Sequence, residues 1–254
     1  MLLLPYAVFA AAEHELTRQE RALAAATACI TGAVTTLPID VIKTRIQTLP
    51  PRTSVGRVAA SILSQDGPRG FFRGLAPALL MTPGSILQYT LYDELRKSLP
   101  PLPAATLAGI VDITVRTPFE KLKTVAQAGV FPQGHLWSGY GATLLRDVPY
   151  VCIYWSAYDL LKRIPHDNTA VHGFVAGFCA GAIAASACTP FDVVKTRIQT
   201  APPGLAPFGV FANLIRTQGI TYLFAGLPAR LVRIPVYTGV VLATFETAKF
   251  YFAK

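Results

Sequence analysis

Six long apolar segments follow one another along the chain, each bounded by charged or helix-breaking residues. They lie at roughly residues 20–47, 74–98, 102–127, 139–163, 170–199 and 225–252. A membrane-spanning helix needs about 20 apolar residues, and we expect most of these segments to qualify. The third is marginal, because Pro100, Pro101 and Pro103 shorten its apolar run. The pattern predicts an all-α membrane protein with six transmembrane helices and both termini on one side.

Two short polar strings, each occurring three times, divide these segments into three two-helix repeats. The first string ends the odd-numbered segments, at Pro38–Gln47, Pro118–Gln127 and Pro190–Gln199. The second closes the even-numbered segments, at Tyr92–Arg96, Tyr158–Lys162 and Phe245–Lys249. The sequence therefore predicts a single domain over residues 1–254, with repeats at 20–99, 100–165 and 168–254.

Composition narrows the class of protein. Asp, Glu, Lys and Arg make up 15% of the 254 residues, and mean hydropathy is +0.42, whereas a soluble domain carries about 25% charged residues. The net charge of +9 fits basic flanks near anionic lipid rather than nucleic-acid binding. The single cysteines show no metal-ligand spacing, and no nucleophile–base set or phosphate loop points to an enzyme. The N-terminal segment Met1–Ala12 lacks the basic region of a secretory signal, and we interpret it as a short interfacial or frayed terminus.

The repeated strings resemble the signature of the mitochondrial carrier family. That signature is a proline with an acid two positions later and bases five and seven positions later, followed by acid–glycine and then aromatic–base–glycine. Repeat one matches both parts, through Arg45 and Asp66 to Gly74. Repeat three has Gln218 in place of the second acid, and repeat two has Val125 at the second base. The resemblance implies a monomeric, three-fold pseudosymmetric six-helix bundle in the mitochondrial inner membrane, which moves a small metabolite by alternating access.

The resemblance also implies two gates made of acid–base pairs between successive repeats. On the matrix side these pairs are Asp40 with Lys123, Glu120 with Lys195 and Asp192 with Lys43, each braced by one of the glutamines Gln47, Gln127 and Gln199. On the cytoplasmic side they are Asp93 with Lys162, Asp159 with Lys249 and Glu246 with Arg96. Tyr92 and Tyr158 are the expected braces of the second network, whereas Phe245 lacks the hydroxyl.

Substrate contacts are expected midway between the gates, 12–13 residues before each acid of the second network. These positions, which match the contact points of the family, are Leu80 and Met81, Arg146 and Asp147, and Arg233 and Ile234. Arg146 can pair bidentately with a carboxylate, and Asp147 can bind a cationic group. Arg233 offers a second anion contact, while Leu80 and Met81 offer only apolar contact. In the family, an arginine–acid pair on the fourth helix resembles the amino-acid class.

Within that class several substrates remain open. Leu144–Tyr150 is similar to carriers of S-adenosylmethionine and to glycine- and glutathione-related branches, and Arg116–Gln127 is closest to the S-adenosylmethionine branch. That branch places an acid on the first helix, and residues 31–37 contain none. Asp112 on the third helix is either its substitute or a cap of a shortened helix. The main expectation is an amino-acid-derived substrate, S-adenosylmethionine included. Glutathione or glycine transport, and a transport-inactive scaffold, are the alternatives.

Repeat two is shorter than the other two repeats. The signature proline and the later glycine are 36 positions apart in repeats one and three, but 21 apart between Pro118 and Gly139. The difference of about 15 residues predicts that repeat two lacks the amphipathic surface helix of the matrix side. The aromatic–x–glycine elements that end at Gly74, Gly139 and Gly226 resemble the cardiolipin sites of the family, and the middle site is expected to be weakened.

Overall fold

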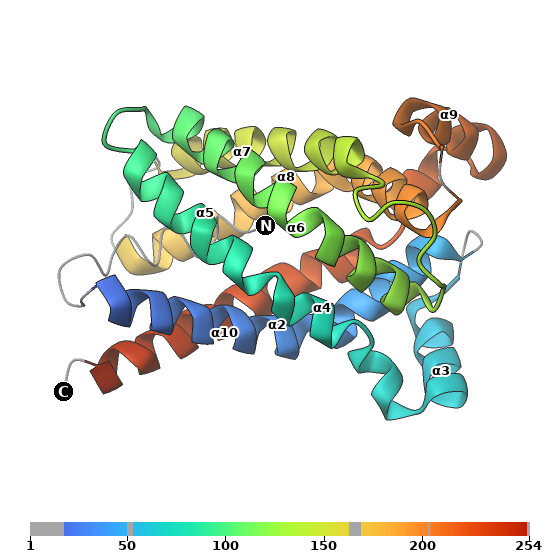
Figure 1. The fold of residues 1–254 in the computed structure, drawn as a ribbon, viewed down its shortest axis with the longest axis horizontal. Coiled ribbons are helices and arrows are strands. Elements are labelled where there is room, and N and C mark those ends of the chain that lie inside the picture. Colours follow the sequence, from blue (N-terminus) through green and yellow to red (C-terminus); the bar gives the residue numbers. More distant parts are fainter. Residues whose placement is uncertain (1–17, 50–52, 163–168, 203, 253–254) are drawn as a thin grey trace.

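The computed structural model describes residues 18–49, 53–162, 169–202 and 204–252. Long helices lie side by side and form a bundle (Figure 1). They are α2 (Arg18–Thr48), α4 (Leu75–Leu80) with α5 (Thr82–Leu95), α6 (Pro101–Ala128), α7 (Tyr140–Lys162), α8 (Thr169–Thr200) and α10 (Leu227–Phe252). The described part of the chain contains no strand, which confirms the all-α class. The start of α2 and the end of α10 lie at the same end of the bundle (Figure 1).

The six predicted segments match these helices closely, with two corrections. The third segment is not short: α6 runs from Pro101 to Ala128, because prolines in a first helical turn replace N–H groups that have no partner there. The second is interrupted at Met81, one residue before the pair Thr82–Pro83 begins α5. Proline lies inside α2, α6 and α8 at Pro38, Pro118 and Pro190, and each helix continues past it.

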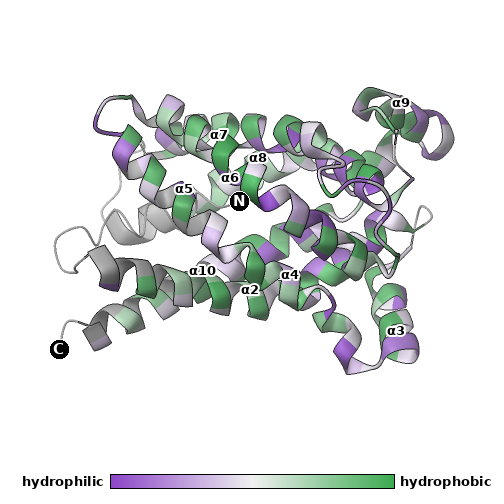
Figure 2. Cartoon of the chain, in the orientation of Figure 1, coloured by the Kyte–Doolittle hydropathy of each residue, from purple (hydrophilic) through white to green (hydrophobic). Residues whose placement is uncertain are grey.

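Hydropathy by itself recognises only part of this bundle. Among the described residues one helical stretch, Val175–Thr200 in α8, is long and apolar enough to cross a membrane by length and composition. The expectation that most segments would qualify on this criterion was therefore wrong. The other long helices fall short because they carry charged and hydroxyl side chains, many of which line an internal cavity. Figure 2 shows the hydrophilic residues gathered towards the end that carries the short helices α3 (Val55–Asp66) and α9 (Pro207–Gln218).

The helices pack most extensively across the repeat boundaries, α10 against α2 and α7 against α8. Ala24 and Ala28 of α2 are fully buried against Tyr237, Val241 and Phe245 of α10. A Cβ atom at Gly32 would lie 2.7 Å from Val241 Cγ2, so the first helix can approach the last only with glycine there. Small residues at helical spacing thus allow close contact where no water drives association.

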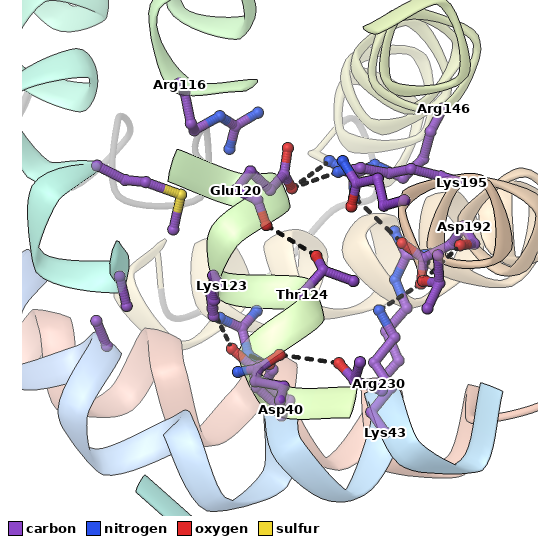
Figure 3. Close-up of a pocket in the computed structure, with 18 of the residues that line it drawn as sticks. Asp40, Lys43, Arg116, Glu120, Lys123, Thr124, Arg146, Asp192, Lys195 and Arg230 are labelled. Atoms are coloured by element: carbon purple, nitrogen blue, oxygen red, sulfur yellow. Dashed lines mark hydrogen bonds and ion pairs between the residues drawn. The ribbon is translucent and has the colours of Figure 1, made fainter. Parts of the chain in front are cut away.

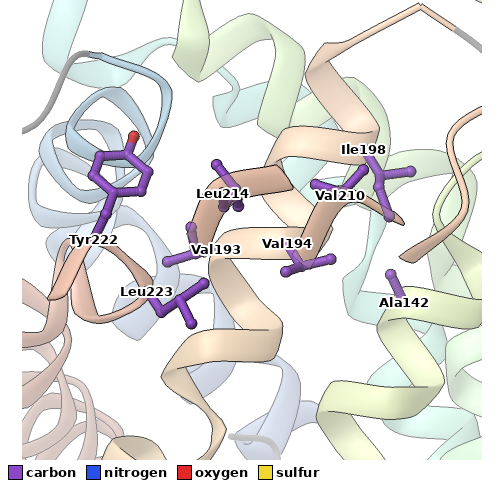
Figure 4. Close-up of a cluster of buried hydrophobic side chains, with 8 residues drawn as sticks. All are labelled: Ala142, Val193, Val194, Ile198, Val210, Leu214, Tyr222 and Leu223. Atoms are coloured by element: carbon purple, nitrogen blue, oxygen red, sulfur yellow. The ribbon is translucent and has the colours of Figure 1, made fainter. Parts of the chain in front are cut away.

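Repeats one and three each carry a surface helix that packs on an odd-numbered helix. In repeat three, α9 places Val210 and Leu214 against Val193 and Ile198 of α8, beside the 3-10 turn η2 (Ile220–Phe224), as Figure 4 shows. In repeat one, Val58 and Ile62 of α3 bury Val41 of α2. Asp66 at the end of α3 then pairs with Arg45 (2.6 Å) and with Arg73 (2.5 Å). The second base and the acid–glycine element of the signature therefore attach the surface helix to the bundle.

Repeat two has no helix at this place, as its shortened sequence predicts. Residues 130–139 connect α6 directly to α7, and two side chains hold this connection. Lys121, fully buried, donates from Nζ to the carbonyl oxygens of Gln133 (2.5 Å) and His135 (2.8 Å). Trp137 Nε1 donates to the carbonyl of Thr114 (3.3 Å), four residues before Pro118. That carbonyl would lack a helical partner because proline has no N–H.

Replacing Lys121 with Met should release the connection and leave the helices folded. The substitution removes two hydrogen bonds to a charged donor, each contributing about 1.5–3 kcal/mol, and keeps the buried apolar stem. We expect faster limited proteolysis between Val130 and Trp137 at unchanged helical circular dichroism. Lys97→Met, which alters an exposed lysine at the end of α5, is the control. Equal cleavage rates in the two variants would contradict the assignment.

Candidate functional site

Six side chains from α2, α6 and α8 form a ring of ion pairs where these helices contact one another. Lys123 Nζ lies 2.7 Å from Asp40 Oδ2, and Lys43 pairs with Asp192 and Lys195 with Glu120 (Figure 3). These are the three pairs that the cyclic arrangement of repeats predicts. We call Asp40, Lys43, Glu120, Lys123, Asp192 and Lys195 the ion-pair ring. It closes the bundle at the end where α2 and α8 lead into the connections that carry α3 and α9.

The three glutamines behind the ring differ in their contacts. Gln47 donates from Nε2 to Asp192 Oδ2 (3.1 Å) and accepts from Thr196 Oγ1 (2.8 Å), so it braces one pair as expected. Gln127 accepts from Thr44 Oγ1 (2.9 Å) without a hydrogen bond to the ring. Gln199 is buried and neither of its amide atoms has a partner among the described residues. The expectation that each glutamine braces an ion pair therefore holds for Gln47. It does not hold for Gln127 and Gln199, whose amides make no hydrogen bond to a ring residue.

Each aromatic–x–glycine element lies close to a ring lysine or to the glutamine behind the ring in a neighbouring repeat. Gly74, Gly139 and Gly226 all have positive φ angles, of 83°, 90° and 81°. A Cβ at Gly226 would lie 3.1 Å from Lys43 Cγ, and one at Gly139 would lie 3.0 Å from Gln199 Cγ. Glycine is required for both reasons, because a side chain would strain the backbone and displace the ring.

A cavity of about 190 Å³ lies directly against the ring. Eleven charged side chains line it, seven basic and four acidic, which leaves an excess of three positive charges. The bases are Lys43, Lys123, Lys195, Arg116, Arg146, Arg230 and Arg233, and the acids are Asp40, Glu120, Asp147 and Asp192. A cavity with this charge imbalance favours an anionic ligand.

Arg146 contacts three of the four acids that line the cavity. It pairs with Asp147 through Nε (2.5 Å) and NH2 (2.9 Å), and reaches ring acids Asp192 (3.2 Å) and Glu120 (3.3 Å). Arg233 pairs with the third ring acid, Asp40, and stacks over the Tyr237 ring at 5.4 Å. The residues expected at mid-depth are therefore joined to the ring, and the predicted contact site and closure form one network.

Two further arginines of the network were not among the predicted contacts. Arg116 NH2 lies 2.9 Å from Asp147 Oδ2, and Arg230 lies 3.9 Å from Asp192 and over the Tyr150 ring at 5.5 Å. Their distance along the sequence from predicted site residues could have identified both arginines. Arg116 is one helical turn before Glu120, and Arg230 is three residues before Arg233, so each shares a helix face with a predicted residue.

The paired substrate positions do not all face the cavity. Met81, Arg146, Asp147 and Arg233 line it, whereas Leu80 and Ile234 do not. Leu80 is 56% exposed on the outer surface, and Ile234 is buried in an apolar cluster with Tyr150 and Tyr154. Counting back from the acids identifies a depth in the bundle but not a face, and neighbouring helical residues point about 100° apart. The expectation that Leu80 and Ile234 contact substrate is corrected accordingly.

The predicted network at the opposite end falls partly outside the description. Four side chains of this network lie outside the described residues, namely those of Asp93, Lys162, Glu246 and Lys249. Asp159 is exposed, and Arg96 donates to the carbonyl of Leu99 (3.0 Å). Tyr92 is buried, and Tyr158 stacks on Tyr154 with ring centroids 6.1 Å apart. The second gate therefore stays a prediction.

A helical bundle of three related repeats with an ion-pair closure and a charged internal cavity defines a membrane transporter rather than an enzyme. The profile of the mitochondrial carrier protein family matches residues 14–103, 123–169 and 166–254. The chain belongs to the mitochondrial carrier family and is a multi-pass protein of the mitochondrial inner membrane.

Similar curated proteins are named as glutathione transporters. The mitochondrial glutathione transporter SLC25A40 of Mus musculus is 29% identical over 237 residues, covering 76% of this chain and 70% of the relative. The human protein of that name is 26% identical over 319 aligned positions and 94% of each chain. The mitochondrial glutathione transporter SLC25A39 of Danio rerio is 32% identical over 239 residues, covering 76% of this chain and 66% of the relative.

Neutralising one acid of the ring should destabilise the bundle. Asp40→Asn leaves Lys123 and Arg233 without their buried counter-charge, and breaking a buried pair costs about 3–5 kcal/mol. We expect the Tm in detergent to fall by several degrees. Glu94→Gln, which removes an exposed carboxylate at the end of α5, should leave the Tm unchanged. A Tm for Asp40→Asn equal to that of Glu94→Gln would show that the ring does not hold the bundle together.

Proposed function

We propose that this carrier transports glutathione or a closely similar small peptide. The observation that carries the proposal is the charge of the cavity, which has three more basic than acidic side chains. Glutathione has two carboxylates, one ammonium group and a net negative charge at neutral pH. S-adenosylmethionine is a net cation, and the cavity charge opposes it. Glycine is a zwitterion without net charge, and it offers a single carboxylate to the four arginines of the cavity.

The relatives support the same choice. Three of the similar proteins described above are named as glutathione transporters, and one of them aligns along nearly the whole chain. The amino-acid class expected from Arg146 and Asp147 includes this substrate, since glutathione carries the α-amino and carboxylate groups of an amino acid. The S-adenosylmethionine reading rested on the segment around Arg116, which in the structure serves to hold Asp147.

The ion pairs suggest how substrate binding leads to opening. Arg146 divides its donors among Asp147, Glu120 and Asp192. A substrate carboxylate that pairs with Arg146 competes with the two ring acids for the same guanidinium. A second carboxylate on Arg233 competes likewise with Asp40. Substrate binding therefore weakens contacts that hold the ring acids towards the cavity, and we propose that this lowers the cost of opening the ring towards the matrix.

We also propose that the carrier acts as a monomer and binds cardiolipin at its surface. A groove of about 480 Å³ lies between the start of α3 and the start of α10, and Ser54, Val55, Gly226 and Pro228 are among its lining residues. Two helix N-termini facing one groove favour a phosphate group. The equivalent position around α6 has only one helix start, that of α4 at Leu75, because repeat two has no surface helix.

Uptake into proteoliposomes tests the transport proposal. We expect saturable uptake of radiolabelled glutathione that excess unlabelled glutathione abolishes and excess S-adenosylmethionine or glycine does not. Uptake of S-adenosylmethionine or glycine without glutathione would refute the substrate. A folded protein without flux for any of the three would favour the scaffold alternative.

Arg146→Lys should reduce glutathione uptake about tenfold to a hundredfold. Lysine keeps the charge but cannot form the bidentate contact, and losing a charge-assisted hydrogen bond costs about 1.5–3 kcal/mol, while 1.4 kcal/mol corresponds to a factor of ten. Initial rates over a range of glutathione concentrations measure the effect. Arg69→Lys, at an exposed arginine of η1 (Pro68–Phe72), should transport normally. Equal rates for both variants would exclude Arg146 as the carboxylate contact.

A further inference from the structure

A second, smaller space opens beside the central cavity, between α5, α6 and α7. Its volume is about 30 Å³, and Gln88, Gly109, Asp112, Val148 and Val151 are among its lining residues. We call this space the side chamber. Arg116 and Asp147 line both the side chamber and the central cavity. The two spaces are therefore neighbours that share two charged side chains.

Two buried oxygen atoms of the side chamber have no hydrogen-bond partner among the described residues. They are Oδ1 of Asp112 and Oε1 of Gln88, and the side chains are 1% and 5% exposed. The other carboxylate oxygen of Asp112, Oδ2, lies 3.3 Å from Arg116 Nε. Burying an acceptor without a donor is costly, and packing alone gives no reason for placing two of them in one space. These two oxygens are therefore without a donor among the described residues, while Arg116 Nε, which lines the same chamber, makes an ion pair with Asp112 but no hydrogen bond.

The backbone around the side chamber leaves room for the acceptors. A Cβ at Gly84 of α5 would lie 3.0 Å from Asp112 Oδ1, which is closer than side chains normally pack. Asp112 is also well inside α6, which runs from Pro101 to Ala128, so it is not a helix cap.

The charge of the side chamber is opposite to that of the central cavity. Asp112 and Asp147 line it with Arg116 between them, which leaves one excess negative charge. The central cavity has three excess positive charges. A molecule with an ammonium group at one place and carboxylates at another would be oriented by this difference. Among the described residues no cluster of His, Cys, Asp and Glu is suited to a metal ion, and the space matches a group the size of ammonium.

We propose that the side chamber binds the ammonium group of the transported molecule, which donates hydrogen bonds to Asp112 Oδ1 and Gln88 Oε1. The carboxylates of the same molecule then face the arginines of the central cavity. This inference rests on the proposed function and adds to it a specificity site on α5 and α6. Asp112 and Gln88 distinguish substrates with an amino group from otherwise identical anions.

A substrate pair that differs only in the amino group tests the inference. Glutathione is compared with glutaryl-cysteinyl-glycine, which has a hydrogen atom in place of the α-amino group. We expect the wild-type carrier to prefer glutathione about tenfold or more in initial rate at low concentration, the effect of one charge-assisted contact. Asp112→Asn should reduce this preference to less than about threefold by lowering glutathione uptake, while uptake of the analogue changes little.

Two further variants keep the result interpretable. Gln88→Leu removes one acceptor and leaves the Asp112–Arg116 pair intact, so it should also lower the preference even if Asp112→Asn fails to fold. Glu94→Gln, at an exposed carboxylate on the same helix as Gln88, should retain the full preference.

The possible outcomes separate the two proposals. The inference would be overturned if Asp112→Asn or Gln88→Leu lowered the uptake of both compounds equally. The two side chains would then only support Arg116 or a bound water. Wild-type uptake of both compounds at equal rates would overturn it as well and leave the transport proposal standing. A folded wild-type protein that takes up neither compound would refute glutathione transport itself.

Discussion

Three ion pairs between different repeats are the interaction on which the rest of this structure depends. Each ring acid finds its base on the next odd-numbered helix, so the ring charges of one repeat are neutralised only by those of its neighbours. Charges at bilayer depth are costly unless they are paired. The bundle must therefore close around all three helices at once. The glycines that touch the ring, such as Gly226 against Lys43, follow from the same constraint because nothing larger fits there.

Sharing of the ring acids joins substrate recognition to closure. Asp40, Glu120 and Asp192 each contact an arginine of the cavity as well as a lysine of the ring. Each acid is thus paired with both an arginine and a lysine. A ligand that binds the arginines therefore changes the electrostatic environment of the acid–lysine pairs. Counting 12–13 residues back along the even-numbered helices places the substrate contacts midway between the gates. Contacts at that depth without ion pairs to the ring would lack this direct coupling.

The shortened second repeat shows which parts of the architecture can be replaced. Repeat two keeps its ring residues Glu120 and Lys123 but has no surface helix, and Lys121 and Trp137 fasten the direct connection instead. Position 121 corresponds to Val41 and Val193 in the other repeats, where valine packs against α3 and against the α9 side. A buried lysine bonded to two carbonyls thus substitutes for apolar contact with a helix.

The sequence by itself determined the helices and their threefold relation, because these follow from repeated local spacing, and the resemblance of its repeated strings to a known family implied the partners within the ring. It also placed Met81, Arg146, Asp147 and Arg233 at the cavity. It did not decide which neighbour in each pair faces inward, and so included Leu80 and Ile234. Asp112 joins the charged network through Arg116 on its own helix. Only the tertiary structure brought Arg116 and Arg230 into that network, because their partners Asp147 and Asp192 lie on other helices whose rotation and approach depend on packing.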